Sequence, residues 1–336
     1  MIEFKGRFNF VLGLTAWMVS TVAFADAALW QDVARTSIAP NGAAFVQPTR
    51  SRSLTLDFDG FKTLLKSAPL ERETAAANSS FEIALPKVDG SFERFTVVES
   101  PIMEPGLARK YPQFRTYLGQ SIDDASATVR FDLTQFGLRA QILSWRGTSY
   151  IEPMQRGDTT HYMAFLKNDL PRTDRTFSCG VQSGAQEPMN FQKRGVMPKV
   201  SSGATLRTHR LAMAATGEYT SALGGTVADG LAGIVTTMNR VNGIYEREVS
   251  IRMVLVANTD LLIFTNAASD PYANTSGDLA ANQTTVTNTI GSANYDIGHL
   301  VGTGGGGVAA LDDKLNRRAQ LRGNAADAGD KALDGA

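Results

Sequence analysis

The apolar pattern of residues 226–250 constrains the fold more than any other feature of this sequence. Apolar side chains recur there at intervals of three and four residues, as on one face of an α-helix: Leu231, Ile234, Val235, Met238, Val241, Ile244 and Tyr245. Thr226 is placed to cap this helix, with Asp229 in the first turn. Four polar residues fall off the stripe: Asn239, Arg240, Glu246 and Arg247. We predict a long amphipathic helix that docks on a sheet.

Apolar strands flank the predicted helix on both sides. Upstream, Leu211 and Met213 alternate with polar or small residues, and residues 251–264 form a second apolar run downstream. Strand, helix and strand in this order predict a βαβ unit, which begins an α/β sheet. A polar loop follows, then a second helical stretch over residues 277–290, and then a glycine run over 302–307.

Residues 26–170 have a different character, because short runs with a period of two are separated by turn residues. The runs over 127–133 and 138–145 predict a hairpin through residues 134–137, and one short helix is expected near residues 60–65. This part is predicted to be a β-rich domain. Residues 171–204 are rich in Pro, Gly and polar side chains, which predicts a linker that proteases can reach.

The N-terminus predicts export. Lys5 and Arg7 precede an apolar run over residues 8–24, and Ala23-Phe24-Ala25 is a small-x-small cleavage site. We expect residues 1–25 to be a cleaved signal peptide and the protein to be secreted, either extracellular or periplasmic. The alternative is an uncleaved anchor, but the run is short of the ~20 apolar residues that a span needs.

Composition limits the chemistry. Lys and Arg together number 33, as do Asp and Glu, so nothing indicates nucleic acid or an anionic membrane as a partner. The single cysteine, Cys179, excludes an intramolecular disulfide. The three histidines are His161, His209 and His299, and we expect structural roles for them, because zinc requires a convergent set of ligands.

Three strings in the second half resemble a known family: HRLAMAATGEYT, MNRVNGIYEREVSIRMVLVANTDLLIFTN and GSANYDIGHLVGTGGGGVA. They resemble reprolysin/adamalysin-type secreted zinc metallopeptidases (metzincins) of bacterial type. The resemblance is strongest over 205–308, and VVESPIMEPGLARKYPQFRTYLG resembles the propeptide before such domains. It implies an α/β (α+β) fold: a mixed sheet with long helices, the N-terminal half of a metzincin-like domain, after a β-rich propeptide-like domain.

The resemblance also implies a zinc site on a helix with the pattern H-E-x-x-H-x-x-G-x-x-H, in which two histidines bind the metal and the glutamate activates water. The sequence contains no H-E-x-x-H, and residues 309–336 are polar and divergent. We therefore assign no catalytic or metal residue, expect no zinc to bind this chain, and interpret it as truncated before the zinc-binding helix. A frameshift near Val308 would explain the change, and the downstream DNA in the other frames tests it.

Cys179 gains a role from the same resemblance. Phe177-Ser178-Cys179-Gly180-Val181 resembles the family's cysteine switch, in which a thiolate occupies the open zinc position of the zymogen. The alternative is a lone surface thiol in a linker. Two further candidate sites are weak. The glycine run lacks the Lys and Ser/Thr that a phosphate-binding loop needs. Oxygen ligands for Ca²⁺ are available from Asn258, Asp260 and Asp270, but these residue types are common in loops.

These observations favour a secreted zinc metallopeptidase precursor that acts on peptide bonds of proteins or peptides. Without the catalytic helix, this chain is predicted to be inactive alone. The alternative is a non-catalytic secreted binding or inhibitory module that keeps the β-rich domain. A third outcome is an unstable fragment, with apolar surface left uncovered along the helix stripe and at residues 261–264. The oligomeric state is not predicted.

Overall fold

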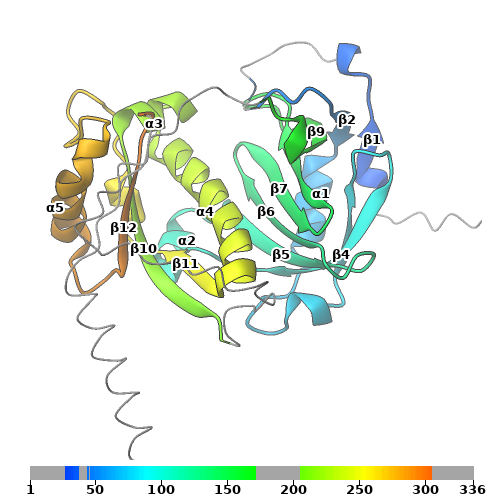
Figure 1. Cartoon of the computed structure of the whole chain (residues 1–336), viewed down its shortest axis with the longest axis horizontal. Coiled ribbons are helices and arrows are strands. Elements are labelled where there is room, and N and C mark those ends of the chain that lie inside the picture. Colours follow the sequence, from blue (N-terminus) through cyan, green and yellow to red (C-terminus); the bar gives the residue numbers. More distant parts are fainter. Residues whose placement is uncertain (1–26, 38–43, 45, 172–204, 305–336) are drawn as a thin grey trace, which may run out of the picture.

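The structure is a computed structural model of the chain, and it describes residues 27–37, 44, 46–171 and 205–304. The predicted signal peptide, the linker with Cys179, and the tail over 309–336 lie outside these residues. Among the helices of the described part, none combines the length and the apolar character that crossing a bilayer requires. The described fold is a mixture of helices and two sheets, one large and one small (Figure 1).

The large sheet has nine antiparallel strands in the order β1-β2-β9-β8-β7-β6-β5-β4-β3. Its strands are β1 (Trp30–Asp32), β2 (Arg52–Leu56), β3 (Glu82–Pro86), β4 (Phe92–Glu99), β5 (Arg115–Ser121), β6 (Thr128–Thr134), β7 (Gly137–Ser144), β8 (Gly147–Pro153) and β9 (His161–Leu166). The predicted hairpin is confirmed, because Thr134 pairs with Gly137 at the turn between β6 and β7. One face of the sheet packs with helix α1 (Phe58–Leu65) around a core that includes Phe61, Phe95 and Phe131.

Residues 53–61 alternate in the β-rich pattern, and the short helix expected near residues 60–65 in fact begins earlier than that. Strand β2 ends at Leu56, and α1 begins at Phe58. The Asp57 side chain accepts a hydrogen bond from the Gly60 N–H at 2.9 Å, which caps the new helix. The alternation of Leu54, Leu56 and Phe58 therefore does not mark a strand as far as Phe58, because Asp57 caps the helix that begins there.

The small sheet has three parallel strands in the order β11-β10-β12: β10 (Arg207–Ala215), β11 (Ile251–Leu255) and β12 (Ile297–Val301). Helix α4 (Val227–Val249) connects β10 to β11, so the predicted βαβ unit is confirmed. The remaining helices are α2 (Pro105–Lys110), α3 (Gly217–Leu223) and α5 (Leu279–Ile290). Helix α3 was not predicted from the sequence. The apolar run over 251–264 forms a strand only as far as Leu255 and then a 3-10 turn over Thr259–Leu262.

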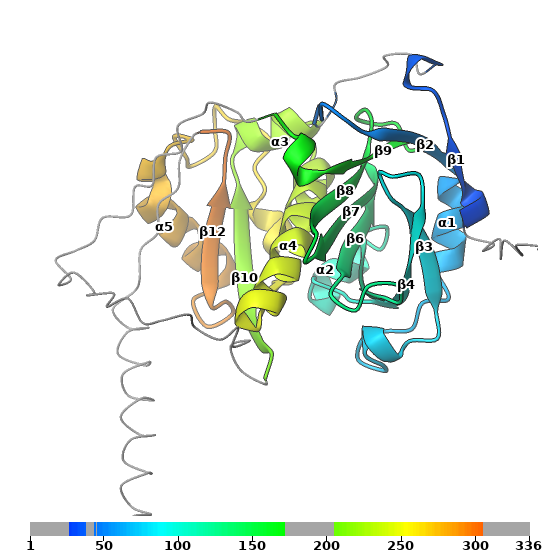
Figure 2. The same cartoon turned by 45° about the vertical axis from the view of Figure 1, so that its right-hand side comes forward.

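Helix α4 lies between the two sheets (Figures 1 and 2). Thr226 caps it as predicted, since its side chain accepts from the Asp229 N–H at 3.1 Å. The first four members of the predicted stripe pack into a core with β10 and β11, but Ile244 and Tyr245 are 41% and 43% exposed. The helix is therefore covered on two sides over most of its stripe, and the uncovered apolar surface expected there is limited to its C-terminal end.

Candidate functional site: a buried ionic interface beneath helix α4

The second face of the large sheet is polar and nevertheless buried. Arg130 and Asp132 are two residues apart on β6, so they point to the same side of the sheet. Gln141 and Arg139 of β7 lie opposite them, and Glu152 of β8 lies opposite Arg139. Arg130 is 2% exposed, and Asp132 and Glu152 are each 1% exposed. Helix α4 covers this face, so its charges need partners within the protein.

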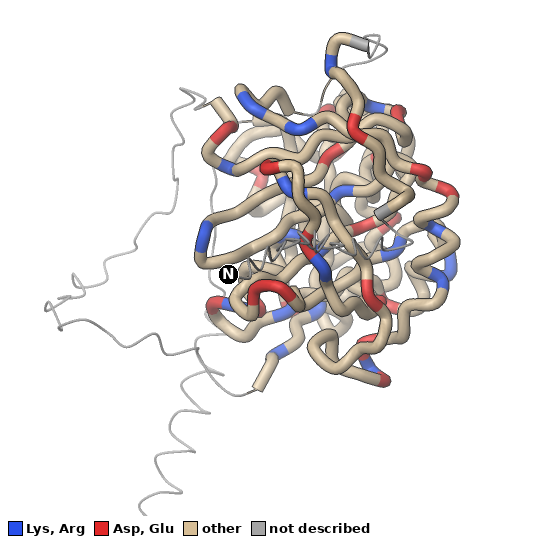
Figure 3. The backbone as a smooth tube through the Cα atoms, turned by 90° about the vertical axis from the view of Figure 1, so that its right-hand side faces the viewer, with Lys and Arg blue, Asp and Glu red and all other residues tan. Residues whose placement is uncertain are grey.

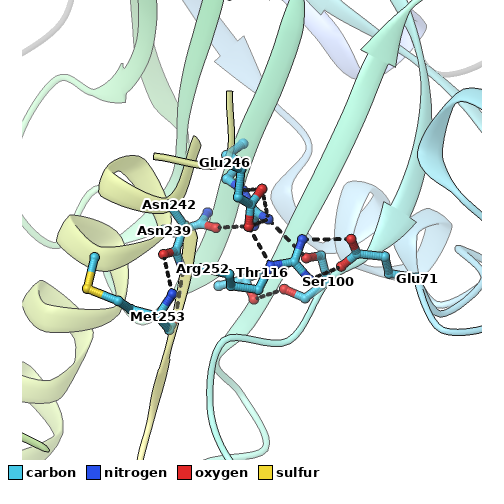
Figure 4. A network of polar contacts seen from close by, with 9 residues as sticks. Glu71, Ser100, Thr116, Asn239, Asn242, Glu246, Arg252 and Met253 are labelled. Carbon is cyan, nitrogen blue, oxygen red and sulfur yellow. Dashed lines mark hydrogen bonds and ion pairs between the residues drawn. The ribbon is translucent and has the colours of Figure 1, made fainter. Parts of the chain in front are cut away.

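The first cluster joins β6 to the C-terminal half of α4 (Figure 4). The Arg130 guanidinium donates to the Glu246 carboxylate at 2.6 and 2.7 Å, to Asn239 Oδ1 at 3.1 Å, and to Ser100 Oγ at 3.3 Å. Burial lowers the pKa of Arg130, and Glu246 opposes that effect. Asn239 is fully buried in this contact. The polar side chains off the helix stripe therefore bind the large sheet.

Arg252 at the start of β11 extends the cluster. Its guanidinium donates to both oxygens of Glu71, at 2.7 and 2.8 Å, and also contacts Glu246. These pairs raise the pKa of Arg252 against the opposing effect of burial. Burial acts to raise the pKa of Glu71, but Arg252 and Ser100 outweigh it, so the net pKa of Glu71 is lowered. Glu246 is thus shared by two arginines from different sheets.

Asn242 attaches α4 to the small sheet. Its side-chain amide donates to the Met253 carbonyl and accepts from the Met253 N–H, both at 2.8 Å. Asn242 is fully buried, and the paired contacts imitate one rung of a β-ladder (Figure 4). Asn239 and Asn242, three residues apart on one helix, therefore bind different sheets.

The second cluster lies beneath the middle of α4. Thr236 donates to Asp132 Oδ2 at 2.7 Å, and Glu152 accepts from Arg139 at 2.6 Å and from Arg240. Burial raises the pKa of Asp132 to about 6, although Thr236 and the two arginines oppose it. Burial would also raise the pKa of Glu152, but Arg139 and Arg240 outweigh it and hold the pKa below its usual range.

Four side-chain atoms at this interface make no hydrogen bond to protein atoms within the described residues: Asp132 Oδ1, Gln141 Oε1, Asn239 Nδ2 and Arg240 Nε. They are two acceptors and two donors, so ordered water between them would complete the network. The charges also balance, since Arg130, Arg139, Arg240 and Arg252 face Glu71, Asp132, Glu152 and Glu246.

A short segment before α2 extends the small sheet. Met103 forms a parallel bridge with Leu255 of β11. The Leu255 N–H donates to the Ile102 carbonyl at 2.8 Å, and the Glu104 N–H donates to the Leu255 carbonyl at 2.9 Å. The Glu104 carboxylate then accepts from the Ala257 N–H at 2.8 Å. The edge of β11 is therefore paired with a segment from the other half of the chain.

The three histidines do not converge. His161 of β9 contacts Asp158 at 2.7 Å. His209 of β10 lies opposite Met253, whereas His299 of β12 lies opposite Met213 of β10, four residues further along the strand. At about 3.3 Å per residue, that offset separates His209 and His299 by roughly 13 Å along the sheet. They cannot share one metal ion in this arrangement.

The other candidate residues have separate partners. Asp260 accepts from Lys110 at 2.9 Å, and Asp270 accepts from the Gly217 N–H at 2.6 Å, so the structure does not bring them together as Ca²⁺ ligands. The start of the glycine run is held by Asn274, whose Oδ1 accepts from the Thr303 N–H at 2.9 Å. Residues 305–307 and Cys179 lie outside the described part. The role of Cys179 stays a prediction.

The polar residues under α4 were not predicted as a site. Their alternation along β6 and β7 is the usual pattern of a solvated sheet face, so periodicity cannot show that a helix covers it. Asn239 and Asn242 are the one available signal. Asparagine is a poor helix former, and two of them in the middle of a long helix indicate that their side chains have specific partners.

A long helix between parallel strands, attached to an antiparallel sheet by buried ion pairs, defines an α+β protein whose two sheets both contact that helix. Residues 205–317 match the family model described as Metallo-peptidase family M12B Reprolysin-like. These residues are therefore similar to reprolysin-like metallopeptidases of the metzincin type. No curated protein matches the chain.

The matched family implies zinc for its own members, and the residues of this chain do not fit that ion. Among the described residues, no group of three or more His, Cys, Asp or Glu could hold a metal. The printed sequence has three histidines and no H-E-x-x-H, so it does not supply the two-histidine helix that such a site requires.

Proposed function

We propose that this chain is a secreted precursor form of a reprolysin-like zinc metallopeptidase. In this proposal, residues 26–170 are the propeptide-like domain, residues 171–204 are the linker, and residues 205–308 are the N-terminal half of the peptidase domain. The match of residues 205–317 to the M12B family is the observation that carries it. The implied reaction is hydrolysis of peptide bonds in proteins outside the cytoplasm.

The interface under α4 supports the propeptide-like role. The N-terminal sheet covers the polar side of the long helix, and the segment Ile102–Glu104 pairs with the edge of β11, so this part of the chain contacts two of the elements that match the family. A domain with this contact would assist the folding of the peptidase half. Cys179, in the linker, would correspond to the cysteine-switch residue of the family, whose thiolate occupies the zinc and keeps the zymogen latent.

We also propose that these 336 residues hydrolyse no peptide bond by themselves, because they lack the histidines and the glutamate that bind zinc and activate water. The test is a peptidase assay on the purified, exported chain with a mixed quenched-fluorescent peptide library, together with zinc analysis. We expect no chelator-sensitive hydrolysis and substoichiometric zinc. Stoichiometric zinc, together with hydrolysis that a chelator abolishes, would overturn the proposal that the chain has no catalytic zinc site.

Two further measurements test secretion and ancestry. N-terminal sequencing of the exported protein should begin at Asp26, and a start at Met1 would contradict signal-peptide cleavage. The encoding DNA beyond the Val308 codon should contain an H-E-x-x-H in another frame, and its absence would exclude the frameshift. Specific binding of a secreted protein without any such coding sequence would instead support the non-catalytic binding module.

A further inference from the structure

We propose that the N-terminal unit (described residues 27–171) stays bound to the C-terminal unit (residues 205–304) after the chain is cut between residues 172 and 204. The two units would then form a two-chain complex held by the interface under α4. This inference rests on the proposed function and deepens it, because it separates cutting of a precursor from release of its propeptide-like domain.

Backbone pairing is the first argument. The segment Ile102–Glu104 belongs to the N-terminal unit, and it makes two main-chain hydrogen bonds with Leu255 of the C-terminal unit. The Glu104 side chain adds a third bond to the backbone N–H of Ala257. A cut in the linker removes none of these bonds. Separation would expose the edge of β11, which is costly for a strand with apolar neighbours.

The charged groups are the second argument. Arg130 and Asp132 of the N-terminal unit are almost fully buried, and their partners Glu246 and Thr236 lie on α4 of the C-terminal unit. Arg252 of the C-terminal unit is in turn paired with Glu71. Because these ion pairs are shielded from solvent, salt screens them less than it screens surface pairs. The complex should therefore tolerate high ionic strength.

A shared apolar core is the third argument. Ile102, Leu107 and Phe136 from the N-terminal unit pack in one buried cluster with Leu231 and Leu255 from the C-terminal unit. Interfaces that bury a common apolar core resemble those of permanent complexes rather than those of mobile domains. Release of the N-terminal unit would expose this core together with the polar face of α4.

The complementarity also identifies the partner. The N-terminal sheet presents Arg and Asp/Glu side chains beneath α4; Arg139 and Glu152 pair within the sheet, whereas Arg130 and Glu152 also pair with Glu246 and Arg240 of the helix. Seen from the side of the large sheet, basic and acidic positions are interspersed along the chain (Figure 3). The face beneath α4 is a separate surface, and because its Arg130 and Asp132 meet Glu246 and Thr236 of the helix, it suits the chain's own C-terminal unit rather than a polyanion.

The experiment uses the full chain with a site for a specific protease inserted between Gly184 and Ala185. After folding and complete cutting, size-exclusion chromatography with light scattering is run at about 150 mM and about 1 M salt. We expect both fragments in one peak of unchanged mass at both salt concentrations. Elution of the fragments in separate peaks at either concentration overturns the proposal.

A variant tests the stated contacts. Arg252→Met leaves Glu71 and Glu246 without a shared cation, and we expect the cut complex to dissociate at least 10-fold faster. Lys62→Gln, at an exposed pair with Asp59, is the control and should not change the rate. If Arg252→Met does not fold, Lys110→Met at the half-exposed pair with Asp260 replaces it, with a smaller acceleration expected. Rates equal to those of the control would overturn the role of the ion pairs.

The readout involves neither zinc nor hydrolysis, so the two proposals can fail separately. If the fragments stay together and the encoding DNA contains no peptidase sequence, the proposed association of the two units is supported and the proposed function is refuted. Fragments that separate, with an H-E-x-x-H in another frame, would leave the function intact and remove the binding.

Discussion

Asp132 should make the folded protein less stable as the pH rises. Its carboxyl is 1% exposed, and burial raises its pKa to about 6 from the ordinary value of 3.8. The folded state therefore holds a proton that the unfolded state has lost between these two values, and stability falls with rising pH in that window. At 1.36 kcal/mol per pKa unit, the loss from this group reaches about 3 kcal/mol by pH 7.

The substitution Asp132→Asn isolates this effect. The amide oxygen can still accept from Thr236, but the buried group no longer ionises. Urea unfolding of the two proteins should give similar free energies near pH 4. The variant should become more stable than the parent by about 3 kcal/mol near pH 7, and the difference should then level off.

The matched control is Asp123→Asn. Asp123 is paired with Arg94 at the surface, and that pair lowers its pKa, so the carboxylate stays charged from pH 5 upward. Its effect on unfolding should therefore be independent of pH between 5 and 8. The reasoning would be refuted if the stability difference for Asp132→Asn were constant over this pH range, or if it favoured the parent as the pH rises. Either result would show that the pKa of the buried Asp132 carboxyl is not raised.

Three further predictions follow from single contacts, each measured by urea unfolding. Arg252→Met should destabilise the uncut chain by about 3–5 kcal/mol, because it leaves the partly buried Glu71 without its ion-pair partner and Glu246 with Arg130 alone. A loss below about 1 kcal/mol would show that solvent already screens the cluster. Asn242→Ala should cost about 1–3 kcal/mol, since the buried N–H and carbonyl of Met253 lose their side-chain partner; an unchanged midpoint would contradict it. Thr226→Ala should cost about 1 kcal/mol through loss of the cap of α4, and Thr226→Ser should restore most of it.

Much of the local structure could be predicted from residue patterns. The spacing of the apolar stripe predicted α4, and the alternating runs predicted β10 and β11. The short turn at residues 134–137 predicted the β6–β7 hairpin. These signals are local, because they depend on backbone geometry and on near neighbours. The boundaries failed where one side-chain bond decided them, as at Asp57, which caps α1 and ends β2.

The family resemblance and the missing zinc motif were also visible in the sequence, since both depend on short strings of residues. The domain boundaries, the signal peptide and the switch role of Cys179 stay predictions. The candidate site was different in kind. Its members come from positions as far apart as Glu71 and Arg252, and no local pattern relates them.

The sequence by itself determined the main helix and strands of the βαβ unit, the β6–β7 hairpin, and that α4 has one apolar face and one polar face. Only the tertiary structure decided that the polar face is buried as well. An alternating strand such as β6 carries polar side chains on one side whether that side meets water or a helix. The buried ion pairs under α4 exist because the two sheets close on the helix from both sides, and that closure depends on contacts between distant residues.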